Sequence, residues 1–281
     1  MTSIKSLLPA LPLELYEEIV KDFDITTFLN LLLVNYAFRG IAEANLYRHP
    51  MDIIYSSFAI PPKSIERRTK LFITLNRHDR LQKHVRSLRV CADTSLDGTF
   101  VDLFASIISR LINLNSITIC SIELPNPFEV HSMLLRHPPP NIRNLTCDVP
   151  CGDALWKIVR CLPSLQRLTT AAPSHVGTDC RFPSDACPEL SYLNMGSEIH
   201  CLPHILQGRQ ILELEIQVKD ESGLGVVQRL LPVIPRTTRR LFLSVGPYLD
   251  AVISAMHASP LLELNDLILS GDLESVSPVR L

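Results

Sequence analysis

The chain has 281 residues, of which 46% are hydrophobic and 20% charged, and its formal net charge at pH 7 is −2. This composition is typical of a globular protein with a sizeable core, while the near-neutral charge argues against nucleic acid or an anionic membrane as the principal partner. The sequence contains no run of 18 apolar residues, so no transmembrane helix is predicted, and the N-terminus is a poor signal peptide.

Three short helices are predicted between residues 11 and 49, LPLELYEEIVKDFDITTFLNLLLVNYAFRGIAEANLYRH. Pro12 marks the start of the first, since proline has a suitable φ at a first helical position and lacks an N–H that would stay unpaired there. Leu15, Ile19 and Phe23 then recur at a four-residue spacing, which places them on one face of that helix.

The second and third predicted helices follow directly. Asp24 and Thr26 supply side-chain oxygens for capping the second helix, and residues 28–34 are almost all apolar. The third helix carries Ile41 and Leu46 on its apolar side. About forty residues in three helices do not close a sizeable core. We therefore expect a partner or the rest of the chain to cover the remaining apolar surface.

The order of residues in this stretch resembles an F-box, which indicates an F-box helical domain at residues 1–50. The resemblance is carried by Leu11, Pro12, Glu14, Leu15, Ile19, Leu29, Val34, Phe38, Arg39, Leu46 and Tyr47. The sequence Leu-Tyr-Arg-His at its end is similar to a variant common in fungal members. The family implies binding to a Skp-type adaptor, and through it to a cullin, by Leu11, Pro12, Leu15, Ile19, Phe23, Leu29, Leu32 and Val34. The alternative is an N-terminal helical cap whose leucines belong to the core.

Residues 51–84 are predicted to form a basic helical linker. Between Lys63 and Arg89 there are nine Lys or Arg residues and two acidic ones. Leu71, Phe72, Leu75 and Leu81 give this segment an apolar side, which favours helices that join the F-box to the following region. The basic side chains form a solvated helix face, which the overall charge of the chain favours, or a patch that attracts phosphorylated substrate or nucleic acid.

From residue 85 to the end, one motif returns: apolar, two residues, apolar, one residue, apolar. It occurs as Val85-Leu88-Val90, Leu114-Ile117-Ile119, Ile142-Leu145-Cys147, Leu165-Leu168-Thr170, Leu190-Leu193-Met195, Ile211-Leu214-Ile216, Thr238-Leu241-Leu243 and Leu264-Leu267-Leu269. Candidate helices lie between most of these strands, at 100–111, 127–136, 153–161, 202–208, 223–231 and 247–258. The pattern resembles a leucine-rich repeat and predicts an α/β fold at residues 85–281, an irregular solenoid whose concave side is a parallel sheet.

Two features depart from the regular repeat. The ninth position carries no ladder of Asn or Cys, so a doubly wound α/β domain stays open as a competing architecture. The last motif ends near Ser270 and leaves too few residues for a polar cap. This indicates a truncated product or an end that docks on another surface, and we expect marginal solubility for an isolated 85–281 fragment.

The solenoid interpretation also predicts a binding face. Side chains alternate along a strand, so the third and fifth positions of each motif point onto the concave sheet. Candidate contacts to a target protein are Arg89, Arg167, Tyr192, Glu213, Arg240 and Phe242, with the arginines as anion contacts and the two aromatic residues as anchors. The alternative is an ordinary solvated sheet without a ligand.

Neither cofactor nor metal is predicted. The eight cysteines are irregularly spaced and form no C-x2-C pair, which favours reduced thiols in the cytoplasm or nucleus. A metal site that combines Cys147 and Cys151 with the cluster at 200–204 is less favoured than a packed Cys147. His131 and His175 belong to no recognisable triad, and we find no nucleophile elbow, phosphate loop or zinc-protease motif.

The sequence therefore predicts a non-catalytic protein. The favoured interpretation is the substrate-recognition subunit of an SCF-type cullin-RING ubiquitin ligase. In it, the F-box would hold the adaptor and the repeats would bind an unknown protein target, without nucleic acid or membrane as partners. The alternatives are an F-box or repeat scaffold that acts outside a ligase, and an unrecognised α/β enzyme.

Overall fold

The computed structural model describes residues 13–34, 36–48, 50, 63–92, 98–121, 134–149, 151–170, 185–196, 199–218, 221–257 and 264–270. The three predicted N-terminal helices are present as α1 (Leu13–Val20), α2 (Ile25–Leu31) and α3 (Tyr36–Arg48). Two further helices, α4 (Lys63–Arg77) and α5 (Asp79–Gln82), precede the sheet. Among the described residues, none of the helices has both the length and the apolar character that crossing a lipid bilayer requires.

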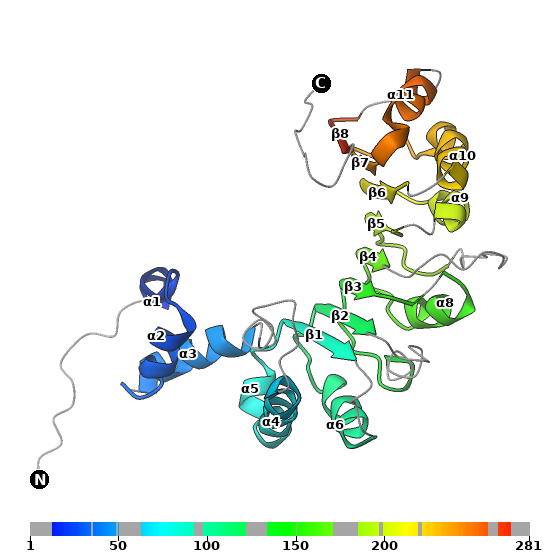
Figure 1. Cartoon of the computed structure of the whole chain (residues 1–281). Helices are drawn as coiled ribbons and strands as arrows, with labels where there is room; N and C mark the ends of the chain where they lie inside the picture. Colours follow the sequence, from blue (N-terminus) through cyan, green and yellow to red (C-terminus); the bar gives the residue numbers. More distant parts are fainter. Residues whose placement is uncertain are drawn as a thin grey trace, which may run out of the picture.

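Eight parallel strands form one sheet in the order β1 to β8, so each strand lies beside the one before it in the chain. They are β1 (Ser87–Ala92), β2 (Ser116–Ser121), β3 (Asn144–Cys147), β4 (Arg167–Thr170), β5 (Tyr192–Asn194), β6 (Glu213–Gln217), β7 (Arg240–Ser244) and β8 (Asp266–Ser270). The strands line the inner side of an arc (Figure 1). A doubly wound sheet reverses its strand order at a switch point, and the sequential order here rules that alternative out.

Helices cover the outer side of the arc (Figure 1). They are α6 (Gly98–Ile108), α8 (Asp153–Arg160), α9 (Leu202–Leu206), α10 (Glu221–Leu230) and α11 (Leu249–His257), with the short 3-10 turns η1 (Ile199–Cys201), η2 (Leu231–Val233) and η3 (Gly246–Tyr248). Each of these five α-helices overlaps a stretch where the sequence predicts a helix. The candidate helix at 127–136 lies mostly outside the described residues.

The core lies between the sheet and the outer helices. The fourth positions of the repeated motif are aligned across the sheet: Leu88, Ile117, Leu145, Leu168, Leu193, Leu214, Leu241 and Leu267. Seven of them are buried, which confirms the predicted register, and the motif's sixth positions are buried from β1 to β7 as well. Leu267 and Leu269 in β8 are half-buried, because no strand follows β8 in the part of the sheet that the structure describes.

A regular backbone pattern joins neighbouring strands at their starts. The carbonyl of Gln166 accepts hydrogen bonds from the amides of Ser191 (2.9 Å) and Tyr192 (3.0 Å), and equivalent pairs recur between every two adjacent strands. The side chain of Thr238 adds a buried bond to the carbonyl of Ile211 (2.8 Å). Thr238 occupies an otherwise apolar position of the motif, and this bond satisfies its hydroxyl.

The N-terminal helices are attached to the sheet through α3. The Glu43 carboxylate is buried and accepts hydrogen bonds from Arg39 Nε in α3 (3.0 Å) and Arg80 Nη2 in α5 (2.9 Å). Tyr47 packs against both the small core of α1–α3 and the core of the sheet. In addition, the amide of Arg86 donates to the carbonyl of Arg48 (3.0 Å), so the end of α3 lies at the start of β1.

The segment predicted as a helical linker carries α4 and α5, and residues 51–62 lie outside the described part of the chain. Phe72 of α4 meets Phe104 of α6 edge-on, with ring centroids 5.6 Å apart. Leu75 and Leu81 belong to the same core cluster as the strands. Helices α4 and α5 therefore pack as part of the outer layer of the sheet.

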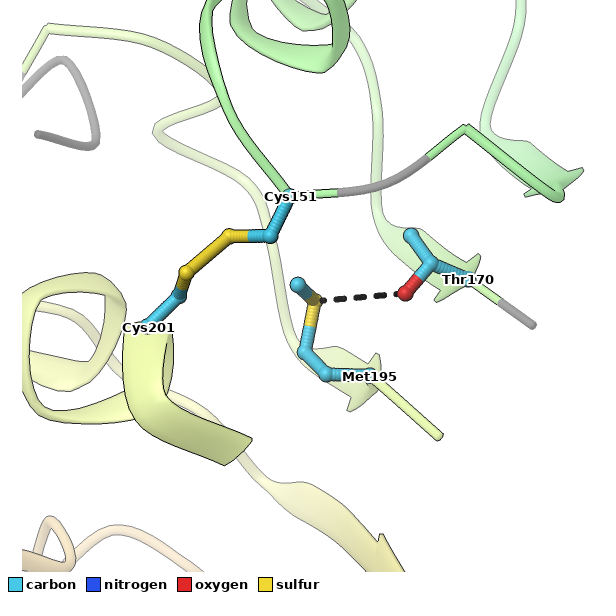
Figure 2. Close-up of a disulfide and its surroundings, with 4 residues drawn as sticks. All are labelled: Cys151, Thr170, Met195 and Cys201. Atoms are coloured by element: carbon cyan, nitrogen blue, oxygen red, sulfur yellow. Dashed lines mark hydrogen bonds between the residues drawn. A yellow bond between two sulfur atoms is a disulfide. The ribbon is translucent and has the colours of Figure 1, made fainter. Parts of the chain in front are cut away.

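Figure 2 shows a disulfide between Cys151 and Cys201, with Cα atoms 7.0 Å apart. This differs from the expectation that the thiols are reduced. Cys151 lies shortly before α8 and Cys201 directly before α9, so stacking of the repeats brings together two side chains that are 50 residues apart. Cys147 is buried in the core, as predicted.

Candidate functional site

Exposed apolar side chains concentrate on α1, α2, the turn after α2 and the first residue of α3. Of the ten large hydrophobic residues that are exposed in the described part of the chain, seven lie between residues 15 and 36. We call these the apolar face: Leu15, Ile19, Ile25, Leu29, Leu33, Val34 and Tyr36. Their exposed fractions run from 43% for Ile25 to 88% for Tyr36. Exposed apolar side chains gathered in one place are typical of a protein interaction site.

The apolar face is supported by a small core of five buried residues: Val20, Phe28, Ile41, Ala42 and Leu46. Asp24 caps α2 by accepting a hydrogen bond from the amide of Thr27 (2.8 Å), as predicted for Asp24, while Thr26 lies inside the helix. Hydrogen bonds from Thr27 lower the pKa of the Asp24 carboxyl, because they favour its charged form. The helices thus have their own core and still expose a second set of apolar side chains.

The eight residues that the family resemblance assigns to the adaptor contact fall into three groups. Leu15, Ile19, Leu29 and Val34 are exposed, Phe23 and Leu32 are half-buried against the small core, and Leu11 and Pro12 lie outside the described residues. The alternative of a cap whose leucines are core does not hold for Leu15 and Leu29, which are 50% and 52% exposed.

Ile25, Leu33 and Tyr36 were not among the eight, although they are 43%, 87% and 88% exposed. Helix α2 ends at Leu31, so Leu33 lies in the turn and outside the helical spacing on which the prediction depends. Periodicity assigned the apolar run at 28–34 to a helix and did not show where that helix ends.

A second surface is the face of the sheet turned away from the helices. Strand pairing aligns one residue from each strand into what we call the polar row: Ser87, Ser116, Asn144, Arg167, Tyr192, Glu213, Arg240 and Asp266. A second row, two positions on, runs from Arg89 in β1 to Phe242 in β7 and Ile268 in β8. The alternation that the motif predicts is therefore present.

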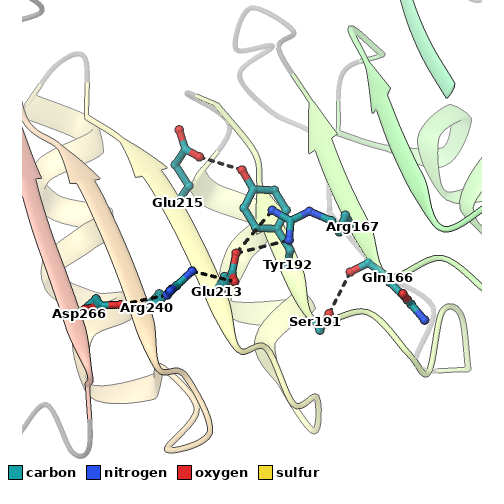
Figure 3. Close-up of polar contacts among 8 residues, drawn as sticks. All are labelled: Gln166, Arg167, Ser191, Tyr192, Glu213, Glu215, Arg240 and Asp266. Atoms are coloured by element: carbon teal, nitrogen blue, oxygen red, sulfur yellow. Dashed lines mark hydrogen bonds and ion pairs between the residues drawn. The ribbon is translucent and has the colours of Figure 1, made fainter. Parts of the chain in front are cut away.

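Ion pairs join four members of the polar row (Figure 3). Glu213 lies 3.4 Å from Arg167 Nη1 and 3.5 Å from Arg240 Nη1, and Arg240 Nε lies 3.0 Å from Asp266 Oδ2. Positive and negative groups thus alternate from β4 to β8, apart from Tyr192. Arg167 and Arg240 are each paired with a carboxylate, so neither is available as the anion contact that the sequence predicted.

Tyr192 is held on both sides. The Arg167 guanidinium carbon lies 3.8 Å from the centre of the Tyr192 ring, and the Tyr192 hydroxyl donates to Glu215 Oε2 (2.8 Å). Burial raises the pKa of the Tyr192 hydroxyl, and the Glu215 carboxylate raises it further. The ring therefore has a fixed position between two charged neighbours, which suits an anchor for a binding partner.

The structure brings Arg167, Tyr192, Glu213 and Arg240 together and separates Arg89 from them, because β2 and β3 lie between β1 and β4. Phe242 is paired in register with Glu215 in the neighbouring strand and is half-buried. The sequence identified the facing positions, but it did not show which charges meet.

The cysteine and histidine residues provide no catalytic arrangement that we recognise within the described ranges. Burial raises the pKa of the Cys147 and Cys187 thiols to about 12, so neither has the thiolate character of a nucleophile. His200 is exposed, and His131 and His175 lie outside the described residues. No group of three or more His, Cys, Asp or Glu side chains among the described residues is arranged to hold a metal ion.

Neither a scan against protein-family models nor a search of curated proteins finds a match to this chain.

Proposed function

We propose that the chain is the substrate-recognition subunit of an SCF-type cullin-RING ubiquitin ligase. Helices α1–α3 act as an F-box whose apolar face binds a Skp-type adaptor, and the strands and outer helices act as an irregular leucine-rich-repeat-like solenoid that binds a target protein. The observation that carries the proposal is the apolar face, which contains four of the eight residues that the F-box resemblance assigns to adaptor contact.

The exposure of this face supports binding on energetic grounds. Fully burying a leucine or isoleucine side chain contributes about 1.5–3 kcal/mol, so burying the exposed half of one contributes about 1 kcal/mol. Leu15, Ile19 and Leu29 are each about half exposed, and Leu33 and Tyr36 have more surface to bury. A partner that covered all seven would gain enough apolar burial for a specific complex.

The sheet supports the second half of the proposal. Sequential parallel strands with helices on one side leave the other side open, and repeat proteins use such surfaces for binding. The mechanism is proximity: the adaptor and the target are held on one chain so that a target lysine lies near the transfer machinery. Such a role uses no side-chain chemistry of this chain, and it takes place in the cytoplasm or nucleus.

The charges of the open face refine the expected target. Between β4 and β8, Arg167 and Arg240 are opposed by Glu213, Glu215 and Asp266, which leaves one negative charge in excess in this part of the face, apart from Arg89 in β1. A target segment with basic side chains therefore fits this face better than the acidic segment that unpaired arginines would favour. Tyr192 and Phe242 supply the aromatic contacts on either side of Glu215.

A pull-down of the full chain with a purified Skp-type adaptor tests the proposal. The informative variant is Ile19→Ala with Val34→Ala, and its control is Ile112→Ala with Val233→Ala, which removes the same atoms from side chains of similar exposure elsewhere. Loss of the adaptor only in the first variant supports the ligase subunit. A folded wild-type chain that does not bind the adaptor would instead favour a repeat scaffold outside any ligase.

A further inference from the structure

A cavity of about 500 Å³ lies where the N-terminal helices meet the start of the sheet. Four basic side chains from three segments line it: Lys21 after α1, Arg48 at the end of α3, and His84 and Arg86 before β1. No carboxylate is among the described residues that line this basic cavity. It is separate from both the apolar face and the polar row.

The backbone brings two of these residues together. The amide of Arg86 donates to the carbonyl of Arg48 (3.0 Å), so the two backbones lie side by side although they are far apart in sequence. Both side chains are exposed and line the same cavity, and a cavity lined by charges of one sign attracts ligands of the opposite sign. The lining therefore favours a bound anion.

Carboxylates of the described residues do not neutralise the arginines of the cavity. Glu43, in the same helix as Arg48, is engaged by Arg39 and Arg80. The side chains of Arg48 and Arg86 form no ion pair within the ranges that the structure describes. Lys21 pairs with Glu18 at 3.6 Å, with both side chains largely exposed, and such a pair is weak and readily exchanged.

The number of charges indicates the kind of anion. Lys21, Arg48 and Arg86 contribute three positive charges, and His84 adds a donor. A phosphate monoester carries a charge of about −1.5 to −2 at neutral pH, so one phosphate leaves the cavity positive and two balance it. Arginine binds phosphate through two parallel N–H bonds, which suits a compact diphosphate contacted by both Arg48 and Arg86.

The rest of the lining fits a small organic molecule. Val20 and Ala44 form an apolar part of the wall. The Asn45 amide nitrogen donates to the carbonyl of Ile41 (3.0 Å), which leaves its amide oxygen as an acceptor. A volume of about 500 Å³ lies within the usual range of small-molecule sites.

We propose that the basic cavity binds a small molecule carrying two or more phosphate groups, such as a nucleoside diphosphate. The ligand bridges α1 and α3 to the segment before β1, and so stiffens the junction between the two surfaces. The proposal is independent of the adaptor, since none of the apolar-face residues lines the cavity.

Isothermal titration of the full chain with inorganic pyrophosphate and with ADP, in the presence of EDTA, tests this site. The variant Arg48→Gln with Arg86→Gln removes two charges from the cavity. The control Arg236→Gln with Arg239→Gln removes two exposed charges near β7. Losing two charge-assisted contacts should weaken binding about a hundredfold, whereas the control should bind as the wild type does.

A third variant, Arg48→Lys with Arg86→Lys, separates a folding defect from the loss of charge, because it restores the charge without the paired N–H bonds of arginine and should restore part of the binding. The inference is overturned if neither probe binds the wild type at millimolar concentration, or if the cavity variant and the control bind alike. It is also overturned if only a phosphopeptide or an oligonucleotide binds, which would indicate a macromolecular partner.

Discussion

Glu43 gives the sharpest stability prediction, because one buried carboxylate connects α3 to α5. Replacing it by Ala removes the hydrogen bonds from Arg39 and Arg80. Hydrogen bonds to charged groups contribute about 1.5–3 kcal/mol each. Both arginine side chains are half exposed, at 49% and 52%, and recover water contacts after the substitution. The contribution of each of the two hydrogen bonds therefore lies near the lower end of the range. Glu43→Ala should lower the free energy of unfolding by about 2–3 kcal/mol.

The assay is urea unfolding of the full chain, followed by circular dichroism. Glu18→Ala is the control, since its pair with Lys21 is exposed and long at 3.6 Å, and an exposed pair contributes at most about 0.5 kcal/mol. Combining Glu43→Ala with Arg80→Ala tests the contact itself, because the two changes should not be additive. Equal effects of Glu43→Ala and Glu18→Ala, or strict additivity with Arg80→Ala, would refute the reasoning.

Three further predictions concern the core, the α2 cap and the disulfide. Leu193→Ala, in a fully buried strand position, should cost about 3 kcal/mol in thermal or urea unfolding, and Leu267→Ala in half-buried β8 should cost clearly less. The pKa of the Asp24 carboxyl is lowered in the folded state. The stabilisation by this capping carboxylate is therefore present at neutral pH and is lost as the pH falls through the lowered pKa. The free energy of unfolding of Asp24→Asn should lack this acid dependence. Non-reducing proteolysis and mass spectrometry should recover Cys151 and Cys201 in one linked peptide, whereas separate alkylated peptides would show reduced thiols.

The strands of the sheet were predictable because the same burial constraint applies to every strand. An inward-facing strand position must be apolar, so the spacing of Leu88, Leu168 and Leu241 in the sequence already marks the register of their strands. Turn residues separate the strands, and amphipathic runs between them predict the outer helices. The capping role of Asp24 was predictable for a similar reason, since it depends on a residue only three positions away.

Contacts between distant residues were not predictable in the same way. Arg167 and Glu213 are 46 residues apart, and their ion pair depends on both side-chain conformation and the position of β5 between their strands. The contact of Glu43 with Arg80 spans 37 residues and two different helices. Spacing identifies which side chains share a face, and only the three-dimensional packing decides which of them meet.

The measurement that tests the central claim most directly is the affinity of the full chain for a Skp-type adaptor, by isothermal titration, with the two matched double variants. Ile19 and Val34 are 50% and 60% exposed, and the control residues Ile112 and Val233 are both 52% exposed. Interface contacts of this kind contribute about 1–2 kcal/mol each, so Ile19→Ala with Val34→Ala should weaken adaptor binding about fiftyfold. Ile112→Ala with Val233→Ala should leave it unchanged. Equal affinities of the two variants, or no binding by the folded wild type, would contradict the assignment of the apolar face as the adaptor site.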